Sequence, residues 1–358
     1  MNFKQLPVQA ALAGAIAAAP VQAATWVYVA NADSQDLSVY ELDRAGGALK
    51  PVATVPVGGM AMPMVVSRDK KYLYVALRSQ PFRVVSFAID GATGGLKKLG
   101  ESALADSMAN IDLDPSGRWL FAASYGGHKI TVNAVGADGV VGAVHQLLPT
   151  APNAHAIHAD RAGRFVFATS LGGDNLSSWR FDAATGRLTA NEPALVSVQP
   201  AKTGPRHFLW NAKQTHAYLL NELDGGVDVF AYDGDKGTMH HLQRASVMPA
   251  GFTGKPWAAD LQLSADGRYL YGSERTSSTL TAFRVDAATG LLQTAGTVPT
   301  EKTPRGFAVD SSGRFIVSAG QGSHAVSLHP VDAATGLPGA GKSYPAGKGP
   351  NWVEIVDF

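Results

Sequence analysis

Residues 260–290 read DLQLSADGRYLYGSERTSSTLTAFRVDAATG and contain three short apolar runs separated by polar segments. The turn at residues 264–268 combines Ser and Asp acceptors with Gly267, which tolerates the positive φ that a tight hairpin needs. The runs themselves are rich in aromatic and aliphatic side chains, which is typical of strands. The stretch therefore predicts three consecutive antiparallel strands, followed by a second turn at residues 286–290.

The same pattern recurs seven times along the chain. Its clearest marker is the aromatic or aliphatic run after the first turn, which returns every 46 to 53 residues. The second turn leads into a fourth, more polar run, as expected of an edge strand. A period of this length indicates a repeat architecture. The central residues of the seven runs are Tyr28, Tyr74, Phe121, Phe167, Tyr218, Tyr271 and Val317.

We predict an all-β fold, a seven-bladed β-propeller with four-stranded blades. Helical solenoids have repeats of similar length, but they need apolar residues at helical spacing, which these runs lack. After residue 23 the chain begins on the second strand type, at Trp26, and ends on the first, at residues 351–356. The C-terminal strand is therefore expected to complete the N-terminal blade and close the ring. Residues 24–358 are expected to form this one propeller domain.

Residues 1–23 differ from the rest of the chain. Lys4 is their only charge, residues 10–19 are Ala-rich, and Val21-Gln22-Ala23 fits a small-residue cleavage site. This order is typical of a secretory signal peptide, so we expect export to a bacterial periplasm. The alternative is a disordered Ala-rich N-terminus.

Composition excludes several classes of function. The net charge is only +1, which favours neither nucleic acid nor, after signal cleavage, a membrane as partner. The chain has no cysteine, which excludes disulfides, thiolate catalysis and Cys-type zinc sites. No Gly-x-Ser-x-Gly motif of a serine hydrolase occurs.

The histidines do not form a metal pair at ligand spacing. His155 and His158 differ by an odd offset, which places them on opposite faces of a strand. We therefore expect no metal and no cofactor, and we expect a monomer.

Non-repetitive polar residues gather where one mouth of the central channel is expected. In antiparallel blades, the start of the first strand and the end of the second lie at the same edge. Each residue alone has an ordinary surface explanation, but together they indicate a site for an anionic or carbonyl-rich small ligand. The candidates are Arg78, His155, Asp174, Arg206, His207, Glu222, Arg275, Arg305 and Gln321.

The chain resembles the bacterial seven-bladed propeller 6-phosphogluconolactonases and the wider propeller lactonase family, which includes fungal carboxymuconate-lactonising enzymes. The resemblance spans essentially all of the chain after residue 23. It implies a lactone hydrolase that needs no metal, with His155, Arg206, Glu222 and Arg275 at the family's active-site positions. The segments that carry it are residues 63–75, Gly204-Pro205-Arg206-His207, Asn221-Glu222, Trp257-Ala258-Ala259-Asp260, Pro304-Arg305-Gly306-Phe307 and Gly349-Pro350-Asn351-Trp352-Val353.

Two departures bear on the substrate. Family members often carry Asp-Leu-Gly-x-Asp where this chain has Ser170-Leu171-Gly172-Gly173-Asp174. The expected export also argues against a phosphorylated sugar lactone, because the phosphogluconolactonases of the family work in the cytoplasm. Gluconolactone or a related unphosphorylated aldonolactone is therefore the expected substrate.

The expected chemistry is ring-opening of the lactone by water. Glu222 or His155 is the expected general base, and the residues leave that choice open. Arg206 and Arg275 are expected to stabilise the oxyanion. The substrate-binding residues are then Arg78, Asp174, His207, Arg305 and Gln321. The alternatives are a non-catalytic periplasmic propeller that binds a ligand or a protein, and a muconate-lactonising isomerase.

Overall fold

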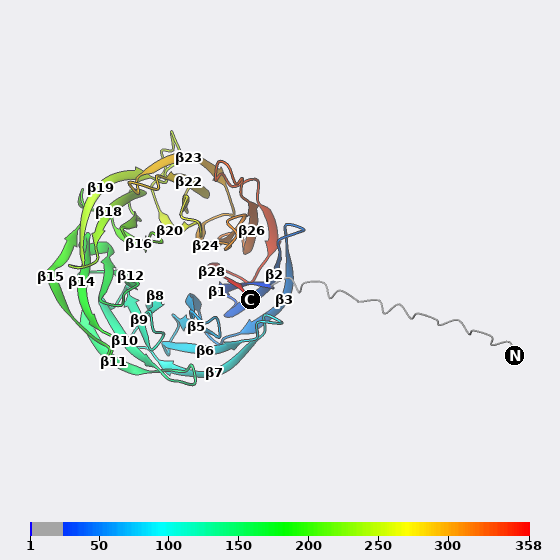
Figure 1. Cartoon of the computed structure of the whole chain (residues 1–358), viewed down its shortest axis with the longest axis horizontal. Helices are drawn as coiled ribbons and strands as arrows, with labels where there is room; N and C mark the ends of the chain where they lie inside the picture. Colours follow the sequence, from blue (N-terminus) through cyan, green and yellow to red (C-terminus); the bar gives the residue numbers. More distant parts are fainter. Residues whose placement is uncertain (2–23) are drawn as a thin grey trace.

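The computed structural model describes residue 1 and residues 24–358. The predicted signal peptide lies almost wholly outside the described residues. In the described part, seven four-stranded antiparallel sheets are arranged in a ring around a central channel (Figure 1). The predicted seven-bladed β-propeller is therefore confirmed.

Each blade has an inner strand beside the channel and three further strands toward the outside. The inner strands are β28 (Pro350–Asp357) in blade 1, followed in blades 2 to 7 by β4 (Ala61–Val66), β8 (Met108–Leu113), β12 (Ala154–Ala159), β16 (Pro205–Trp210), β20 (Ala258–Leu263) and β24 (Pro304–Val309). The second strands are β1 (Thr25–Asn31), β5 (Tyr72–Leu77), β9 (Trp119–Ser124), β13 (Phe165–Ser170), β17 (His216–Asn221), β21 (Tyr269–Glu274) and β25 (Phe315–Gly320).

The third strands are β2 (Asp36–Asp43), β6 (Arg83–Ile89), β10 (Lys129–Val135), β14 (Asn175–Asp182), β18 (Gly226–Asp233), β22 (Thr279–Val285) and β26 (Ala325–Pro330). The outer strands are β3 (Ala48–Pro56), β7 (Leu96–Ala103), β11 (Val141–Pro149), β15 (Arg187–Ser197), β19 (Thr238–Ser246), β23 (Leu292–Pro299) and β27 (Lys342–Pro345). The short 3-10 helix η1 (Leu171–Gly173) follows β13.

The ring closes as predicted. β28, at the C-terminus, pairs antiparallel with β1, so blade 1 is built from both ends of the chain. Figure 1 shows the C-terminus beside β1 and β28. Closure completes blade 1 and places it between blades 7 and 2, so neither of its faces is left uncovered.

The hydrophobic core is divided among the interfaces between neighbouring blades. The second strands are buried on both faces, so they read as continuous apolar runs rather than alternating ones; β1 is buried throughout. Tyr28 of blade 1 packs with Leu73 and Phe87 of blade 2, and Phe121 of blade 3 packs with Val166 and Phe181 of blade 4. Stacked blade faces therefore stabilise the ring.

The repeated second turn joins one blade to the next. Its glycine, for example Gly94, has a positive φ of 69°, and a Cβ there would lie 2.5 Å from the ring of Trp26 in the preceding blade. The indole N–H of Trp26 donates to the carbonyl of Gly91 in the same turn, at 2.9 Å. Only glycine fits this backbone conformation and this close approach. The turn motif is thus repeated because it makes an inter-blade contact.

Candidate active site

The channel mouth is formed by two sets of equivalent positions. Every inner strand has a register shift near its start, and such a bulge re-aims the neighbouring side chains. The second positions of the inner strands are Met62, Ala109, His155, Arg206, Ala259, Arg305 and Asn351. The residues directly after the second strands are Ala32, Arg78, Tyr125, Leu171, Glu222, Arg275 and Gln321.

Glu222 joins two of the predicted arginines. Its Oε2 accepts hydrogen bonds from Nε of Arg206 and from Nη2 of Arg275, each at 2.8 Å. Both guanidinium groups are only 2% exposed, against 14% for the Glu222 side chain. Burial alone would raise the pKa of Glu222, but the two arginines outweigh it and lower that pKa. Glu222 is therefore a carboxylate at neutral pH.

The two arginines are fixed by further contacts. Arg206 donates through Nη1 to the carbonyl of Ala259, and Arg275 donates to the carbonyls of Trp257 and Ala258 at 2.9 Å each. The Arg275 guanidinium also lies 3.9 Å from the centre of the Trp257 ring. Within the described chain, Nη2 of Arg206 and Nη1 of Arg275 make no hydrogen bond. Each arginine therefore has one nitrogen that is not engaged within the described chain.

Arg78 and Arg305 add positive charge beside this cluster. Arg78 donates to the hydroxyl of Ser107 at 2.9 Å, whereas the half-buried Arg305 side chain has no hydrogen-bond partner among the described residues. Burial lowers the pKa of Arg305, and the charges of Arg206, Arg275 and Arg78 lower it further. Arginine stays protonated in proteins, so this shift measures electrostatic crowding. Four guanidinium groups therefore lie at the mouth, two of them bonded to Glu222, which makes the mouth attractive to an anion.

The two predicted histidines lie next to each other, close to Arg206. Their ring centres are 5.0 Å apart, with an interplanar angle of 61°. Burial, followed by the charge of Arg206, lowers the pKa of His155 well below its usual value. The same causes, opposed by Asp260, lower the pKa of His207 to about 4. Both imidazoles are therefore neutral at pH 7.

Two other predicted residues differ in their placement. Gln321 follows β25 at the rim of the mouth and is half-buried. Asp174 follows η1, and its carboxylate accepts the backbone N–H groups of Lys202, Thr203 and Gly204, the loop that leads into β16. Its oxygens therefore organise that loop, and its role in substrate binding stays a prediction.

The prediction that His155 and His158 lie on opposite faces of a strand is wrong. β12 shifts its register between Ala154 and Ile157, so the residues no longer alternate regularly across that segment. His155 lies against His207 at the mouth, and His158 lines a cavity of about 310 Å³ further along the channel. Both histidines therefore face the channel.

Four residues that shape the site are not among the predicted site residues, although the segments that carry the resemblance include three of them. Trp257 lies against Arg275, Tyr125 lies edge-on to His155 at 5.9 Å, and the rings of His207 and Trp352 are 5.8 Å apart. Asp260 accepts a hydrogen bond from Nδ1 of His207 at 2.8 Å. The signal that was available is their place in the repeat, because all four lie within three residues of a strand end at the mouth.

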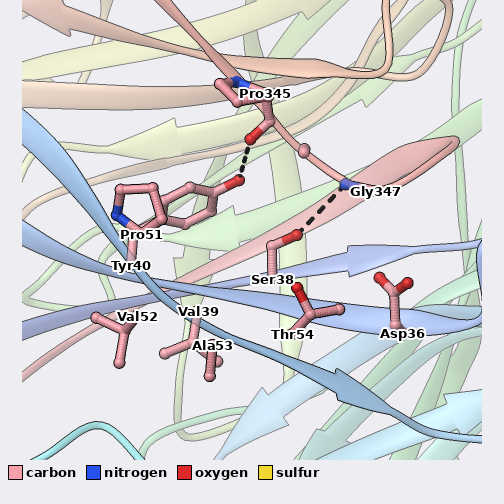
Figure 2. Close-up of a pocket in the computed structure, with 11 residues that line it drawn as sticks. Asp36, Ser38, Val39, Tyr40, Pro51, Val52, Ala53, Thr54, Pro345 and Gly347 are labelled. Atoms are coloured by element: carbon pink, nitrogen blue, oxygen red, sulfur yellow. Dashed lines mark hydrogen bonds between the residues drawn. The ribbon is translucent and has the colours of Figure 1, made fainter.

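A second hollow lies on the outside of the ring. A groove of about 480 Å³ runs between β2, β3 and the segment 345–347, and Figure 2 shows the contacts that border it. Tyr40 donates to the carbonyl of Pro345 at 2.7 Å, and the N–H of Gly347 donates to Ser38 at 3.4 Å. These bonds tie blade 7 to blade 1. The groove contains none of the arginines or histidines of the mouth, so we assign it to the inter-blade seam.

The comparisons with known proteins agree with this geometry. Residues 24–355 match the family model described as lactonase, 7-bladed beta-propeller. The chain belongs to the seven-bladed β-propeller lactonase family. The lactonase is 39% identical to a 6-phosphogluconolactonase of Pectobacterium carotovorum over 330 residues, which covers 92% of this chain and 98% of that relative. The same identity and coverage hold for a 6-phosphogluconolactonase of Serratia proteamaculans.

A solved structure supports the same assignment for this lactonase. The periplasmic gluconolactonase of Pseudomonas aeruginosa superimposes with a TM-score of 0.87 at 30% identity, covering 93% of this chain and 99% of that one. The protein is thus a lactonase of the 6-phosphogluconolactonase type, and the predicted family and enzyme class are confirmed.

Two further features of the described residues concern metals and membranes. Within residues 24–358, no three His, Cys, Asp or Glu side chains are grouped so that they would hold a metal ion. The described part of the lactonase also contains no helix that is long and apolar enough to cross a membrane.

Proposed function

We propose that this lactonase hydrolyses the 1,5-lactone of a sugar acid at the channel mouth. The observation that carries the proposal is the convergence of Arg78, Arg275, Arg305 and the neutral His155 on Arg206, which is bonded to Glu222. A lactone offers one electrophilic carbonyl, and its hydrolysis develops negative charge first on the carbonyl oxygen and then on the product carboxylate. Preorganised cationic donors stabilise such charge.

His155 is the better of the two candidate bases. Glu222 holds two guanidinium groups through one oxygen, so that oxygen cannot take a proton without weakening its bonds to both arginines. His155 is neutral and lies beside the arginines. In the proposed step, Nε2 of His155 takes a proton from water while the water oxygen bonds to the lactone carbonyl carbon. The ring C–O bond then breaks, and the leaving oxygen takes this proton from His155, which restores the neutral imidazole and gives the hydroxy acid.

The arginines divide into two groups. The free nitrogens of Arg206 and Arg275 donate to the oxyanion, while Glu222 holds both side chains in place. Arg305 and Arg78 bind the far end of the substrate, together with Gln321 and with the edge of His207. Loss of one preorganised donor to an oxyanion costs about 2.7–4 kcal/mol of transition-state stabilisation.

We further propose an unphosphorylated aldonolactone as the substrate and the periplasm as the site of action. The composition of residues 1–23 supports export, and so does the likeness to the periplasmic gluconolactonase of P. aeruginosa. N-terminal sequencing of protein from a periplasmic extract tests this location. A mature start near Ala24 is expected, whereas an intact Met1 contradicts export.

The decisive experiment follows acid release from glucono-1,5-lactone and from its 6-phosphate, with and without protein, because both lactones also open spontaneously. We expect acceleration of both, with the larger kcat/KM for the unphosphorylated lactone. Arg305→Ala should raise KM, and His155→Gln should lower kcat by about 10²- to 10⁴-fold. Arg187→Ala, on the exposed start of β15, is the control. No acceleration of either lactone contradicts the function, and a preference for the phosphate contradicts the substrate.

A further inference from the structure

Arg275 is held chiefly by one neighbouring residue, Trp257. The carbonyl of Trp257 accepts both the backbone N–H of Arg275, at 3.1 Å, and its Nε–H, at 2.9 Å. The indole of Trp257 covers one face of the guanidinium group, whose carbon lies 3.9 Å from the ring centre. Trp257 is 43% exposed, whereas Arg275 is 3% exposed. The position of Trp257 therefore determines where the guanidinium group of Arg275 lies.

Trp257 is the last residue of a long loop. The loop, residues 247–257, joins β19 to β20 and is the longest of the seven connections that lead from an outer strand to an inner strand. The other connections are residues 57–60, 104–107, 150–153, 198–204, 300–303 and 346–349. A longer loop has more conformations to lose on folding, so its end needs an additional contact to stay in one place.

Glu274 supplies that contact. It is the last residue of β21 and is fully buried. Its Oε1 accepts the backbone N–H of Trp257 at 2.7 Å, and its Oε2 accepts the N–H and the hydroxyl of Ser277 at 2.5 and 2.6 Å. Hydrogen bonds to a carboxylate are stronger than those to a neutral acceptor. Glu274 therefore ties the end of the loop to the turn after β21, which begins with Arg275.

An acid stands at this strand position in one blade alone. The last residues of the other second strands are Asn31, Leu77, Ser124, Ser170, Asn221 and Gly320. Burying a carboxylate is costly unless it is well bonded, so the blade by itself does not require an acid here. Burial and then the charge of Arg206 lower the pKa of Arg275 to about 9, and the charges of Glu222 and Glu274 oppose this shift. Glu274 therefore also favours the cationic form of the arginine that it helps to hold.

We propose that Glu274 is a positioning residue for Arg275 and acts through the peptide of Trp257. Glu274 fixes the end of the loop, and the carbonyl of Trp257 then fixes both the backbone and the side chain of Arg275. The guanidinium group is thus in place before a ligand binds. The kinetic consequence rests on the proposed function, in which Arg275 donates to the oxyanion; the placement of the arginine does not.

NMR of the full protein labelled with ¹⁵N-arginine tests the placement without substrate. The Nε–H of Arg275, assigned with Arg275→Lys, is buried and hydrogen-bonded, so we expect slow exchange with water. Glu274→Gln offers one acceptor oxygen where the carboxylate has two, so either Trp257 or Ser277 loses its acceptor. We expect the Nε–H of Arg275 to exchange about tenfold faster in this variant. An unchanged exchange rate overturns the proposal.

A double-mutant cycle tests the kinetic consequence. Glu274→Gln should lower kcat on the accepted lactone about 10- to 100-fold and change KM less than about threefold, because a misplaced donor weakens mainly the transition state. In an Arg275→Ala background the same substitution should cost less than about twofold, because its effect passes through the arginine. Equal losses in the two backgrounds overturn the positioning role, since a general loss of stability would not depend on Arg275.

Asn31, at the same strand position in blade 1, supplies the matched control. It is fully buried, its Nδ2 donates to Asp36 and Ser38, and the residue after it is Ala32. Asn31→Ala should lower Tm but keep the wild-type kcat and the slow exchange of the Arg275 Nε–H. An equal loss of kcat in Asn31→Ala would show that any buried residue at this position has the same effect, which overturns the proposal.

Two further outcomes are covered by the design. If Glu274→Gln does not fold, Ser277→Ala removes one of the bonds to Oε2 and takes its place in the cycle. Its expected loss in kcat is about threefold and vanishes without Arg275, and an unchanged kcat then overturns the proposal. If the wild type hydrolyses no lactone, the proposed function fails, while the exchange rate of the Arg275 Nε–H still decides whether Glu274 positions the arginine.

Discussion

At the scale of single residues, the site depends on one carboxylate that neutralises two arginines. Glu222 Oε2 is within 2.8 Å of both guanidinium groups, and neither arginine forms an ion pair with any other described acid. Removing one partner of a buried ion pair leaves an uncompensated charge, which is more costly than the pair itself is stabilising. The carboxylate is thus as important for keeping the arginines in place as for any contact with substrate.

Glu222→Gln should be both less stable and less active. The two guanidinium groups would repel each other without the carboxylate, and we expect a loss of about 3 kcal/mol in the free energy of unfolding. We also expect kcat/KM to fall at least 100-fold, since misplaced donors no longer meet the oxyanion. Urea unfolding and lactone hydrolysis measure the two effects. Glu192→Gln, on the exposed part of β15, is the control. Wild-type turnover in Glu222→Gln would show that Glu222 has no role in the reaction.

Glu354 makes the stability of the protein depend on pH. Burial, together with the charges of Asp112 and Asp260, raises the pKa of Glu354 to about 8, although Trp352 donates to it at 2.9 Å. The folded state then binds a proton between pH 4.5 and 8 that the unfolded state has released, so stability falls as pH rises through this window. Above pH 8 Glu354 is charged in both states, and the folded state then bears the whole cost of burying that charge.

Glu354→Gln should therefore stabilise the protein under alkaline conditions. We expect a gain of about 1–3 kcal/mol in the free energy of unfolding at pH 8 and none near pH 4. The gain is smaller than the full pKa shift implies, because Glu354 borders the channel cavity and solvent there screens its charge. Thermal unfolding of both proteins at the two pH values tests this. A gain that is equal at both pH values would indicate a packing effect rather than a change in protonation.

The main residues of this cluster could be predicted, but their partners could not. Arg206 and Glu222 were brought together by strand order alone, because the start of one strand and the end of the next share an edge. The Asp260–His207 pair joins two different blades, and its geometry depends on the bulge at the start of each inner strand. A bulge inserts one residue, and no residue type marks its place in the sequence. Simple alternation along β12 therefore predicts the wrong strand face for His158 relative to His155.

At the scale of secondary structure elements, the bulges of the inner strands place the site residues, and Gly306 shows how little room they leave. Gly306 follows Arg305 in β24, and a Cβ there would lie 2.5 Å from the carbonyl oxygen of Asn351 in β28. This atom belongs to the backbone of the neighbouring inner strand, so it cannot move aside as a side chain would.

Gly306→Ala should push β24 away from β28 and displace Arg305. We expect a loss of about 2–4 kcal/mol in stability, in the range of overpacked or strained sites, and a raised KM for the lactone. Chemical denaturation and steady-state kinetics are the measurements. Gly126→Ala is the matched control, because a Cβ there meets nothing within 4 Å, and its stability should stay within about 0.5 kcal/mol of the wild type. Equal stability of the two variants would show that the strands can separate.

At the scale of the whole molecule, ring closure was the most predictable feature. The regular spacing gives the number of blades, and the offset between the first strand at Trp26 and the last at residues 351–356 shows which blade is shared. The packing between blades could not be predicted in the same way. It depends on contacts such as that of the turn at Gly94 with Trp26, which bring together residues distant in the chain.

Asn351 connects the closing strand to its neighbours. Its Nδ2 lies 3.1 Å from the carbonyl of Ala30 in blade 1, 3.1 Å from that of Ala61 in blade 2, and 3.0 Å from that of Gly349. The side chain is fully buried, so water does not replace these bonds. One amide therefore links β28 to both β1 and β4 at the seam where the chain ends meet.

Asn351→Ala should lower the stability of the protein more than the replacement of a partly exposed asparagine, because Asn351 holds the closing strand. Buried carbonyls left without a donor cost about 1–3 kcal/mol each, and we expect a total loss of about 2–4 kcal/mol in stability. Hydrogen exchange should then rise first in β28 and β1, because opening begins where blade 1 separates. Asn211→Ala, which removes the side chain that holds a half-exposed turn in blade 5, is the control and should cost about 1 kcal/mol without changing exchange at the seam. Uniform exchange in Asn351→Ala would mean that the ring opens as one cooperative unit instead of at its closing strand.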